Sequence, residues 1–389
     1  MVRLRAAYDG PDLQAVAAEL AISAPELVRR HAEAEHRVQF LGFAPGFAYM
    51  SGGFAVPRLK TPRVRVPAGS LAVADGYTGI YPAGTPGGWR LIGRVAVRMF
   101  DPAATPPSLL RPGDRVVFEP VETVGDLPPP KPRHPRGEPL LRVVTPGAYT
   151  SVQGGPRYGS SAYGVPAGGA MDLASLAAAN ALAGNPPAAA GLEITLAGPE
   201  LEAVREVRVA LRGEVRALLA GQRLKCGGVA KHVREYLAVA GGLEVPGEVT
   251  RPLRAGDDLT RAESPPAEGR APPQPQDRAA IRAFAGPQLD HFADPEAFFT
   301  TEWTVSPQSD RRGVRLMGPP LRLVKRSDIP PEGTAPGAVQ VPGDGLPIAL
   351  GPDRPVTGGY AKIATVAWDD LPLLAQARPG AKLRFRRVR

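Results

Sequence analysis

Apolar and polar residues alternate along most of this chain in short runs, a pattern that predicts β-strands. The first run covers 2–7, and the second covers 36–43. In the segment 56–74, apolar and basic residues alternate around several prolines, which is typical of barrel-edge strands and turns. Similar runs at 207–213 and 281–288 extend the pattern through the rest of the chain. We therefore expect a structure built mainly from short strands.

Only a few segments have the spacing of amphipathic helices. Apolar residues recur at helical intervals over 13–20. A second helix is predicted just after Ser23, whose side chain can cap the backbone, with Glu26 three residues later to complete the capping box. A third helix is expected between Asp172, which can cap its start, and Gly184, which can end it.

Two proline-rich stretches, 124–139 and 264–278, divide the sequence because proline cannot join the interior of a sheet. We interpret both as extended linkers. The predicted organisation is an N-terminal domain at 1–123, the first linker, and a larger region at 140–389 whose two lobes split near 262–279. A Pro-Gly-x-x-apolar-x-Phe sequence closes both the first domain and the chain, which suggests related barrels.

Composition supports this picture. The 389 residues include 45 Gly and 46 Pro, too many for long helices. The fold class predicted is β-rich α+β, with barrel domains and a few short helices. The net charge of +9 comes mostly from dispersed arginine, without the basic and aromatic clusters that bind nucleic acid, and no apolar stretch is long enough to span a membrane. The single cysteine, Cys226, excludes an intrachain disulfide and favours the cytoplasm.

Standard catalytic and metal-binding motifs are absent from the sequence. It has no Walker A loop, HExxH, CxxC pair or GxSxG. His31 and His36 are five residues apart, a poor spacing for metal binding on a helix, and we expect both on the surface. The sequence thus predicts no metal site.

The first candidate binding residues lie in and before a Gly/Pro/aromatic run at 79–94. Cationic donors in one short loop suit a phosphate or carboxylate, and aromatic faces can stack on a planar ligand. The cations are Arg58, Lys60 and Arg63, and the aromatic residues are Tyr81 and Trp89. The alternative is structural: a tight hairpin, with the Trp89 ring in a core.

A second run of the same character covers 340–366. Glycine there would let the chain pass close to a ligand while polar side chains extend toward it. The candidates are Gln340, Asp344, Gly358, Gly359, Tyr360 and Lys362. The structural alternatives are that Asp344 serves its own Asp-Gly turn and that Lys362 lies on a solvated strand face.

Several motifs resemble those of one family. They include GFAPGFAYMSGG, the stretch from VPRLKTPR to GGWRLIGR, GVPAGGAMDLASLAAANALAGN, REYLAVAGG and PGAVQVPGDGLPIALGPDRPVTGGYAKIATV. The chain resembles a fusion of the B and C subunits of 5-oxoprolinase, also called Kip inhibitor and Kip antagonist, which are similar to the carboxyltransferase domain of urea carboxylase and urea amidolyase. On this resemblance, we expect the B-like part to be without the family's N-terminal segment. A Gln-Asp-x-Gly-Arg pattern is replaced by residues 153–157, QGGPR.

This resemblance implies cyclophilin-like β-barrels and ATP-dependent opening of 5-oxoproline to glutamate, with ATP and Mg²⁺ as cofactors and a separate A subunit as partner. It implies catalytic roles for Lys362, Arg63 and Gln340. The implied substrate-binding residues are Arg58, Lys60, Tyr81, Trp89, Asp344, Gly358, Gly359 and Tyr360, which would hold a small anionic or cyclic amide substrate.

Two other functions remain open from the sequence. One is carboxyl transfer to urea or another amide from the biotin of a partner protein. The sequence contains no biotin-carrier motif, so that reaction requires a separate carrier. The other is a non-catalytic binding module that inhibits a sensor histidine kinase. Assembly into a homo-oligomer is compatible with all three.

Overall fold

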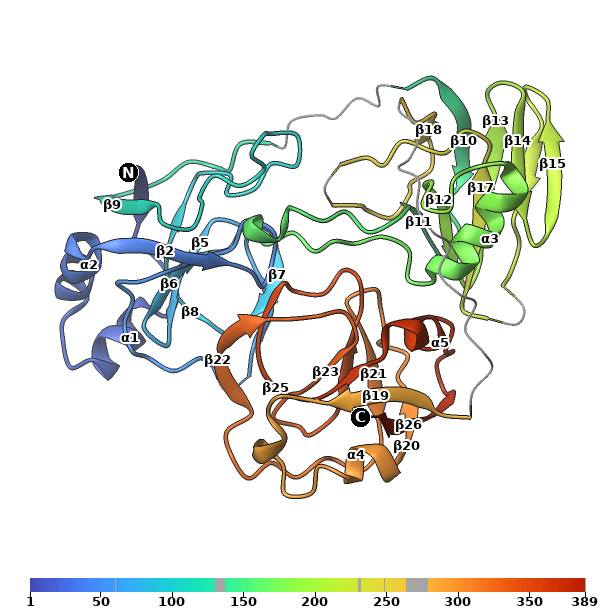
Figure 1. Cartoon of the computed structure of the whole chain (residues 1–389). Coiled ribbons are helices and arrows are strands. Elements are labelled where there is room, and N and C mark those ends of the chain that lie inside the picture. Colours follow the sequence, from blue (N-terminus) through green and yellow to red (C-terminus); the bar gives the residue numbers. More distant parts are fainter. Residues whose placement is uncertain (60, 130–136, 230–231, 248, 264–278, 389) are drawn as a thin grey trace. The chain divides into compact units, whose positions relative to one another are not determined.

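A computed structural model of the chain describes residues 1–59, 61–129, 137–229, 232–247, 249–263 and 279–388 (Figure 1). The chain forms two compact units. The first comprises 1–132, 159–166 and 355–357, and the second comprises 133–158, 167–354 and 358–389. Lys60, residues 130–136 of the first predicted linker and all of 264–278 lie outside the described residues. No helix among the described residues is long and apolar enough to cross a membrane.

The first unit is built on a closed seven-stranded barrel with the order β1-β8-β5-β6-β3-β2-β9. The strands are β1 (Val2–Ala7), β2 (His36–Leu41), β3 (Ala48–Met50), β5 (Ser70–Ala74), β6 (Tyr77–Ile80), β8 (Arg90–Val95) and β9 (Arg115–Val121). Parallel pairing of β1 with β9 closes the ring. A separate two-stranded ribbon joins β4 (Arg63–Val66) to β7 (Thr85–Gly87).

Two helices, α1 (Leu13–Glu19) and α2 (Ala24–Glu33), follow the first strand. The predicted cap of α2 is confirmed, because the Ser23 hydroxyl accepts a hydrogen bond from the Glu26 N–H at 3.3 Å. Leu13, Val16 and Leu27 are buried and belong to the barrel's apolar core. The helical spacing in the sequence therefore marks the face that packs on the barrel.

The second unit begins with two sheets. One has the order β16-β13-β10-β18 and the other β11-β12-β17-β14-β15. Their strands are β10 (Pro139–Thr145), β11 (Tyr149–Gln153), β12 (Gly191–Thr195), β13 (Glu200–Ala203), β14 (Val207–Leu211), β15 (Glu214–Leu218), β16 (Arg223–Lys225), β17 (Arg234–Val239) and β18 (Asp258–Thr260). Helix α3 (Leu173–Ala183) has the expected Asp172 cap, 2.9 Å from the Ser175 N–H, and ends at the left-handed Gly184.

The rest of the second unit is another closed ring of seven strands, which β22 (Asp328–Gly333) extends. The ring strands are β19 (Ile281–Ala285), β20 (Glu302–Val305), β21 (Gly313–Met317), β23 (Ala338–Val341), β24 (Ile348–Leu350), β25 (Thr357–Val366) and β26 (Lys382–Val388). Helices α4 (Ala297–Thr300) and α5 (Leu371–Ala375) and two 3₁₀ turns, Leu289–His291 and Trp368–Asp370, complete this part. A third 3₁₀ turn, Ser161–Tyr163, belongs to the first unit. The predicted β-rich fold with barrels and a few short helices is confirmed.

The two barrels have the same topology. Followed around the ring from its first strand, the second barrel has the order β19-β25-β23-β24-β21-β20-β26. The first barrel has the order β1-β8-β5-β6-β3-β2-β9, so each strand has a counterpart at the same place in the other barrel. The repeated Pro-Gly closing sequence lies at the equivalent place in each, since β9 and β26 both pair in parallel with the first strand of their barrel. Phe118 and Phe385, the phenylalanines of that repeat, are both buried. The weak sequence repeat therefore reports a real duplication of structure.

His31 and His36 are not on the surface, so that prediction was wrong. Both are fully buried in the first unit, with ring centroids 4.6 Å apart. The His31 ring lies between the Tyr8 hydroxyl, at 2.8 Å, and the Thr78 hydroxyl, at 3.0 Å. Burial lowers the pKa of both imidazoles, and for His31 the neighbouring His36 lowers it further. His31 lies on the buried face of α2 and His36 begins β2, so helix packing and the strand turn the two rings inward separately, which spacing along the chain could not reveal.

These buried imidazoles predict acid sensitivity of the first unit. Because their folded-state pKa lies below the unfolded value of about 6.5, the unfolded chain binds more protons as the pH falls below that value. Stability is therefore complete above about pH 6.5 and is lost as the pH falls toward the folded-state pKa. Urea denaturation between pH 8 and 5 measures this slope, which should be shallower in His31→Gln. An unchanged slope in that variant would contradict the role of His31.

Candidate functional site

A shared backbone feature marks the same corner of both barrels. In the first barrel a β-bulge precedes the pairing of Ala72 with Leu91. In the second, a bulge at the equivalent register precedes the pairing of Gln340 with Lys362. A Gly-Pro-x-Leu sequence crosses each bulge, at 10–13 and at 286–289. We call each bulged pairing, together with the Gly-Pro-x-Leu segment that crosses it, a corner. The two corners have the same backbone geometry but carry different side chains.

Glycine is required where this segment crosses the strand. A Cβ on Gly10 would lie 2.4 Å from the Leu91 carbonyl oxygen, and one on Gly286 would lie 2.2 Å from that of Lys362. Both distances are too short for any side chain. This close approach lets the residue two positions later reach the bulged strand with its side chain.

In the first barrel that residue is Asp12, and its carboxylate is fully used. One oxygen accepts from the Leu91 N–H at 2.6 Å and the other from Arg63 Nη2 at 2.8 Å. Arg63 also lies 3.5 Å from the carbonyl oxygen of Trp89. Leu91 and Ala72 contribute no polar group. This corner is therefore closed by an internal ion pair.

In the second barrel the equivalent residue is Gln288, and the corner is polar. The Gln288 Oε1 accepts from the Lys362 N–H at 3.0 Å, while its Nε2 donates to Glu332 Oε1 at 2.8 Å. Glu332 also pairs with the ammonium group of Lys362. Although burial opposes it, hydrogen bonds from Lys362 and Gln288 lower the pKa of Glu332. Lys362 is only 5% exposed, so it is not a solvated surface lysine.

Gln340 adds an unused donor to this corner. Its side chain is 7% exposed, and its Nε2 has no hydrogen-bond partner among the described residues. The amide lies over Gly358 of β25, where a Cβ would come within 2.3 Å of Nε2. A buried donor without a partner costs stability. Gln340 therefore has a hydrogen bond to offer to a ligand, whereas Asp12 in the first barrel has none.

The contact between Gly358 and Gln340 gives a prediction. Gly358→Ala should displace the Gln340 amide and weaken ligand binding at this corner, because the added methyl group occupies its position. Gly333→Ala is the matched control, since a Cβ there meets nothing within 4 Å. Ligand-induced thermal stabilisation of both variants measures the effect. Equal ligand responses in the two variants would remove Gln340 from the site.

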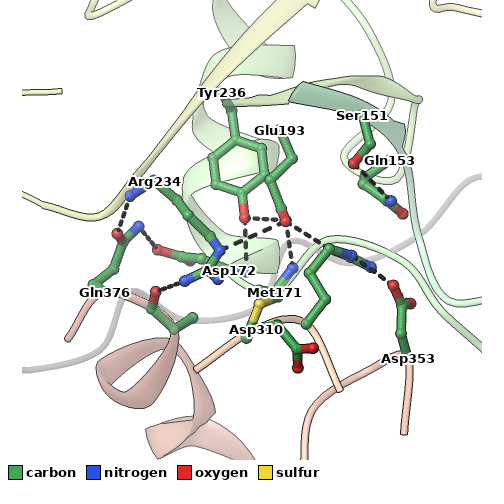
Figure 2. Close-up of polar contacts among 12 residues, drawn as sticks. Ser151, Gln153, Met171, Asp172, Glu193, Arg234, Tyr236, Asp310, Asp353 and Gln376 are labelled. Carbon is green, nitrogen blue, oxygen red and sulfur yellow. Dashed lines mark hydrogen bonds and ion pairs between the residues drawn. The ribbon is translucent and has the colours of Figure 1, made fainter. Parts of the chain in front are cut away.

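A second polar cluster lies deeper in the same unit, around Glu193 of β12 (Figure 2). The Glu193 side chain is inaccessible to solvent. Its Oε1 lies 2.5 Å from Arg311 Nη1 and 3.6 Å from Arg234 Nε. Its Oε2 accepts from the Met171 N–H and the Tyr236 hydroxyl, each at 2.8 Å. Every oxygen of this carboxylate is occupied.

The cluster extends from Glu193 in two directions. Arg311 continues to Asp353, at 2.7 and 2.9 Å, and to the Gly169 carbonyl oxygen at 2.7 Å. The carboxylate of Asp172 accepts from Gln376 Nε2 at 2.8 Å. These bonds fasten the sheets of the second unit to its barrel. Because the Glu193 carboxylate at its centre is saturated, this network positions the lobes and offers substrate no free acceptor there.

Electrostatics agree with a structural role for this cluster. Burial alone would raise the pKa of Glu193, but Arg311 and Arg234, with bonds from Met171 and Tyr236, lower it, so the residue is an anion. Burial and the Glu193 charge raise the pKa of the Tyr236 hydroxyl, which stays protonated and donates to that anion. The charges are thus mutually compensated.

The remaining predicted residues have other partners. Tyr81 and Trp89 are 1% and 5% exposed and pack in an aromatic cluster of the first unit, the structural alternative to stacking. Arg58 pairs with Asp75 at 2.9 Å. Asp344 is exposed and accepts from the Leu346 N–H at 3.0 Å, in its own turn. Lys60 lies outside the described residues.

The structure brings together one part of the predicted set. Gln340, Gly358 and Lys362 meet at the corner, while Gly359 and Tyr360 lie on the same strand, β25. Sequence reasoning missed Gln288 and Glu332, which hold Lys362, and the Glu193 cluster. The sequence does contain a signal for Gln288, because the segment Gly-Pro-Gln-Leu at 286–289 repeats the segment Gly-Pro-Asp-Leu at 10–13 with Gln288 in the place of Asp12. Glu193 carries no local signal, because its partners lie 22 or more residues away in sequence.

Two family models match the sequence. "Carboxyltransferase domain, subdomain C and D" matches 1–110, and "Carboxyltransferase domain, subdomain A and B" matches 163–387. The chain belongs to the carboxyltransferase-domain family. The corner at Lys362 lies within the subdomain A and B match, and the closed corner at Asp12 lies within the subdomain C and D match. The resemblance seen in the sequence is confirmed.

The relatives of this chain are similar to different parts of it. It is 35% identical to the 5-oxoprolinase C subunit of Escherichia coli over 280 residues, 63% of this chain and 90% of that protein. It is 48% identical to the 5-oxoprolinase B subunit of Escherichia coli O157:H7 over 114 residues, 28% of this chain and 52% of that protein. The chain thus spans about half the length of this second relative.

The chain is also similar to a putative urea carboxylase and to a protein of known structure. The putative urea carboxylase of Emericella nidulans is 32% identical over 63% of this chain and 24% of that protein. The crystal structure of TTHA0988 superposes with a TM-score of 0.84 at 38% identity, covering 99% of this chain and 85% of that one. The joined arrangement of both parts therefore occurs in a solved structure.

Proposed function

We propose that this chain is a fused B and C component of an ATP-dependent 5-oxoprolinase, which opens 5-oxoproline to glutamate together with a separate A subunit in the cytoplasm. The observation that carries the proposal is the joining, in one chain, of stretches similar to two separate subunits of that enzyme. The putative urea carboxylase is 32% identical over 63% of the chain, compared with 35% for the C subunit over the same share and 48% for the B subunit over 28%.

The described candidate cations do not fit the triphosphate of ATP. Arg58, Arg63 and Lys362 are each paired with a carboxylate, so none of them adds the net positive charge that a triphosphate needs, although the ammonium group of Lys362 can still donate a hydrogen bond. No group of three or more side chains suited to hold a metal ion occurs among the described residues. We therefore assign ATP activation to the A subunit and ring binding to this chain.

The second-barrel corner supplies what ring opening needs from a binding site. A lactam is stabilised by amide resonance, and negative charge gathers on its carbonyl oxygen when water adds to the carbonyl carbon. Gln340 Nε2 and the Lys362 ammonium group are donors that can stabilise that oxygen. Gln288 and Glu332 hold Lys362 in place. Water supplies its hydroxyl group to the carbonyl carbon and a proton to the ring nitrogen, the C–N bond breaks, and the nitrogen becomes the amino group of glutamate, while ATP is cleaved to ADP and phosphate at the A subunit.

Reconstitution tests this proposal. The purified chain, a purified A subunit and their mixture are incubated with 5-oxoproline and ATP, and glutamate release is measured. Glutamate should form only in the mixture. Turnover by this chain alone would contradict the division of labour. Activity on urea with a biotinylated carrier, without any on 5-oxoproline, would favour the carboxyltransferase, and inhibition of a histidine kinase without turnover would favour the binding module.

A further inference from the structure

Arg354 is a cation near this corner that lacks the carboxylate partner the other candidates have. It lies in the loop between β24 and β25 and is half-buried. Its Nε and Nη2 donate to the carbonyl oxygen of Thr334 at 3.3 and 3.2 Å. Its Nη1 is buried and has no hydrogen-bond partner among the described residues, and no carboxylate there pairs with it. Burial lowers the pKa of this guanidinium.

Thr334 brings Arg354 next to Gln340. The carbonyl oxygen of Thr334 holds the guanidinium, and its methyl carbon lies 3.1 Å from the position a Cβ on Gly358 would occupy. The Gln340 amide is 2.3 Å from that same position. Thr334 therefore contacts both the Arg354 guanidinium and the Gly358 position that the Gln340 amide overlies. Arg354 Nη1 and Gln340 Nε2, one charged and one neutral, are both buried donors without a hydrogen-bond partner among the described residues. Each would be stabilised by an acceptor of matching charge.

We propose that Arg354 and Gln340 form a two-part binding site for a small carboxylic acid that also carries a neutral amide. Arg354 binds the carboxylate, and Gln340 donates to the amide oxygen. The inference rests on the proposed function and specifies how the same corner would recognise 5-oxoproline. Glu332 neutralises Lys362, so this part of the site attracts a second ligand carboxylate only weakly. Glutamate carries such a second carboxylate where 5-oxoproline carries the lactam carbonyl group. The site therefore favours the closed ring over glutamate.

Three small probes separate the two parts of the site. 5-Oxoproline has both groups, 2-pyrrolidinone has the lactam alone, and cyclopentanecarboxylate has the carboxylate alone. Their affinities for the purified full chain are measured by ligand-observed NMR and calorimetry. The variants are Arg354→Gln, Arg354→Lys and Gln340→Ala, with Arg322→Gln, an exposed arginine of the same unit, as control. Thermal melting verifies that each variant is folded.

Arg354→Gln should weaken 5-oxoproline and cyclopentanecarboxylate roughly ten- to a hundredfold, the value of a charged hydrogen-bonded contact. It should leave 2-pyrrolidinone unchanged, and Arg354→Lys should recover part of the loss. Gln340→Ala should show the opposite selectivity, weakening 2-pyrrolidinone and not cyclopentanecarboxylate. The control should match the wild type for all three.

The outcomes separate this inference from the proposed function. If Arg354→Gln changes no affinity, or if the wild type binds none of the probes, the inference is overturned. If the reconstituted enzyme opens 5-oxoproline with the same KM in Arg354→Gln as in the wild type, the inference fails and the proposed function stands. If cyclopentanecarboxylate binding depends on Arg354 but 5-oxoproline is neither bound nor opened, the carboxylate site stands and the proposed function fails.

Discussion

Arg311→Met is expected to lower the free energy of unfolding of the second unit by about 3–5 kcal/mol. The substitution leaves the Glu193 carboxylate buried with only Arg234, at 3.6 Å, as a charged partner. It also removes the bonds to Asp353 and Gly169. A methionine side chain fills much of the volume that the Arg311 side chain occupied. The loss of unfolding free energy therefore comes more from the unpaired Glu193 charge than from a cavity.

Urea denaturation of the full chain measures this loss, with Arg312→Met as the neighbouring exposed control. The double variant Arg311→Met/Glu193→Gln should be more stable than Arg311→Met alone, because it also removes the stranded charge. A single variant as stable as the control would show that the ion pair contributes nothing.

The pH dependence of this cluster has a definite sign. The pKa of Glu193 is lower in the folded protein than its ordinary value. Its contribution is therefore present above the unfolded-state pKa of about 4.3 and is lost as the pH falls through the folded-state pKa. Arg311→Met should weaken this acid dependence, since it removes the main cause of the lowered pKa.

Local patterns predicted the local structure well. The alternation at 2–7 became β1, the Ser23 capping box became the start of α2, and Asp172 capped α3 as expected. These features depend on neighbours within a few residues, so the sequence contains their whole cause. Even the barrel duplication left a trace, in the two Pro-Gly closing sequences.

The features that failed depend on distant partners. His36 faces inward because its strand belongs to a barrel wall, and the carbonyl oxygen of Ser51, which its ring nitrogen contacts at 2.9 Å, lies on another part of that wall. Glu193 and Arg311 are 118 residues apart. Trp89 has the residue type of a stacking platform, and only tertiary packing places it in an aromatic core. Spacing along the chain cannot report such contacts.

The duplicated barrel explains why the two motif runs look alike but differ in chemistry. Each run supplies strand residues of the bulged corner, in β8 of the first barrel and in β23 and β25 of the second, whereas the glycine that the corner requires lies outside the runs, at Gly10 and Gly286. In the first barrel Leu91 and Ala72 make the corner apolar, and Asp12 is neutralised by Arg63. In the second, Lys362 and Gln340 occupy the equivalent positions. The composition of the two runs could not distinguish them, whereas the paired positions show one polar corner, at Lys362 and Gln340, and one corner closed by an ion pair.

Lys362→Met is expected to reduce kcat/KM of the reconstituted enzyme by about 10²–10³, the usual effect of losing one donor to a developing oxyanion. Lys362 is 5% exposed, so methionine preserves most of its packing while removing the ammonium group. The substitution removes the cationic partner of Glu332. Because the Glu332 side chain is 42% exposed, water can solvate its carboxylate instead. The free energy of unfolding should therefore change by less than about 1 kcal/mol.

Steady-state kinetics and urea denaturation are measured together on Lys362→Met. Lys382→Met is the control, because Lys382 is an exposed strand lysine that contacts only the Thr304 hydroxyl among its described bonds. Glu332→Gln should have a smaller effect on the rate than Lys362→Met, since it loosens the ammonium group without removing it. Full activity of Lys362→Met would exclude the ammonium group from the reaction. A large loss of stability with unchanged activity per folded molecule would instead make Lys362 a structural residue of the corner.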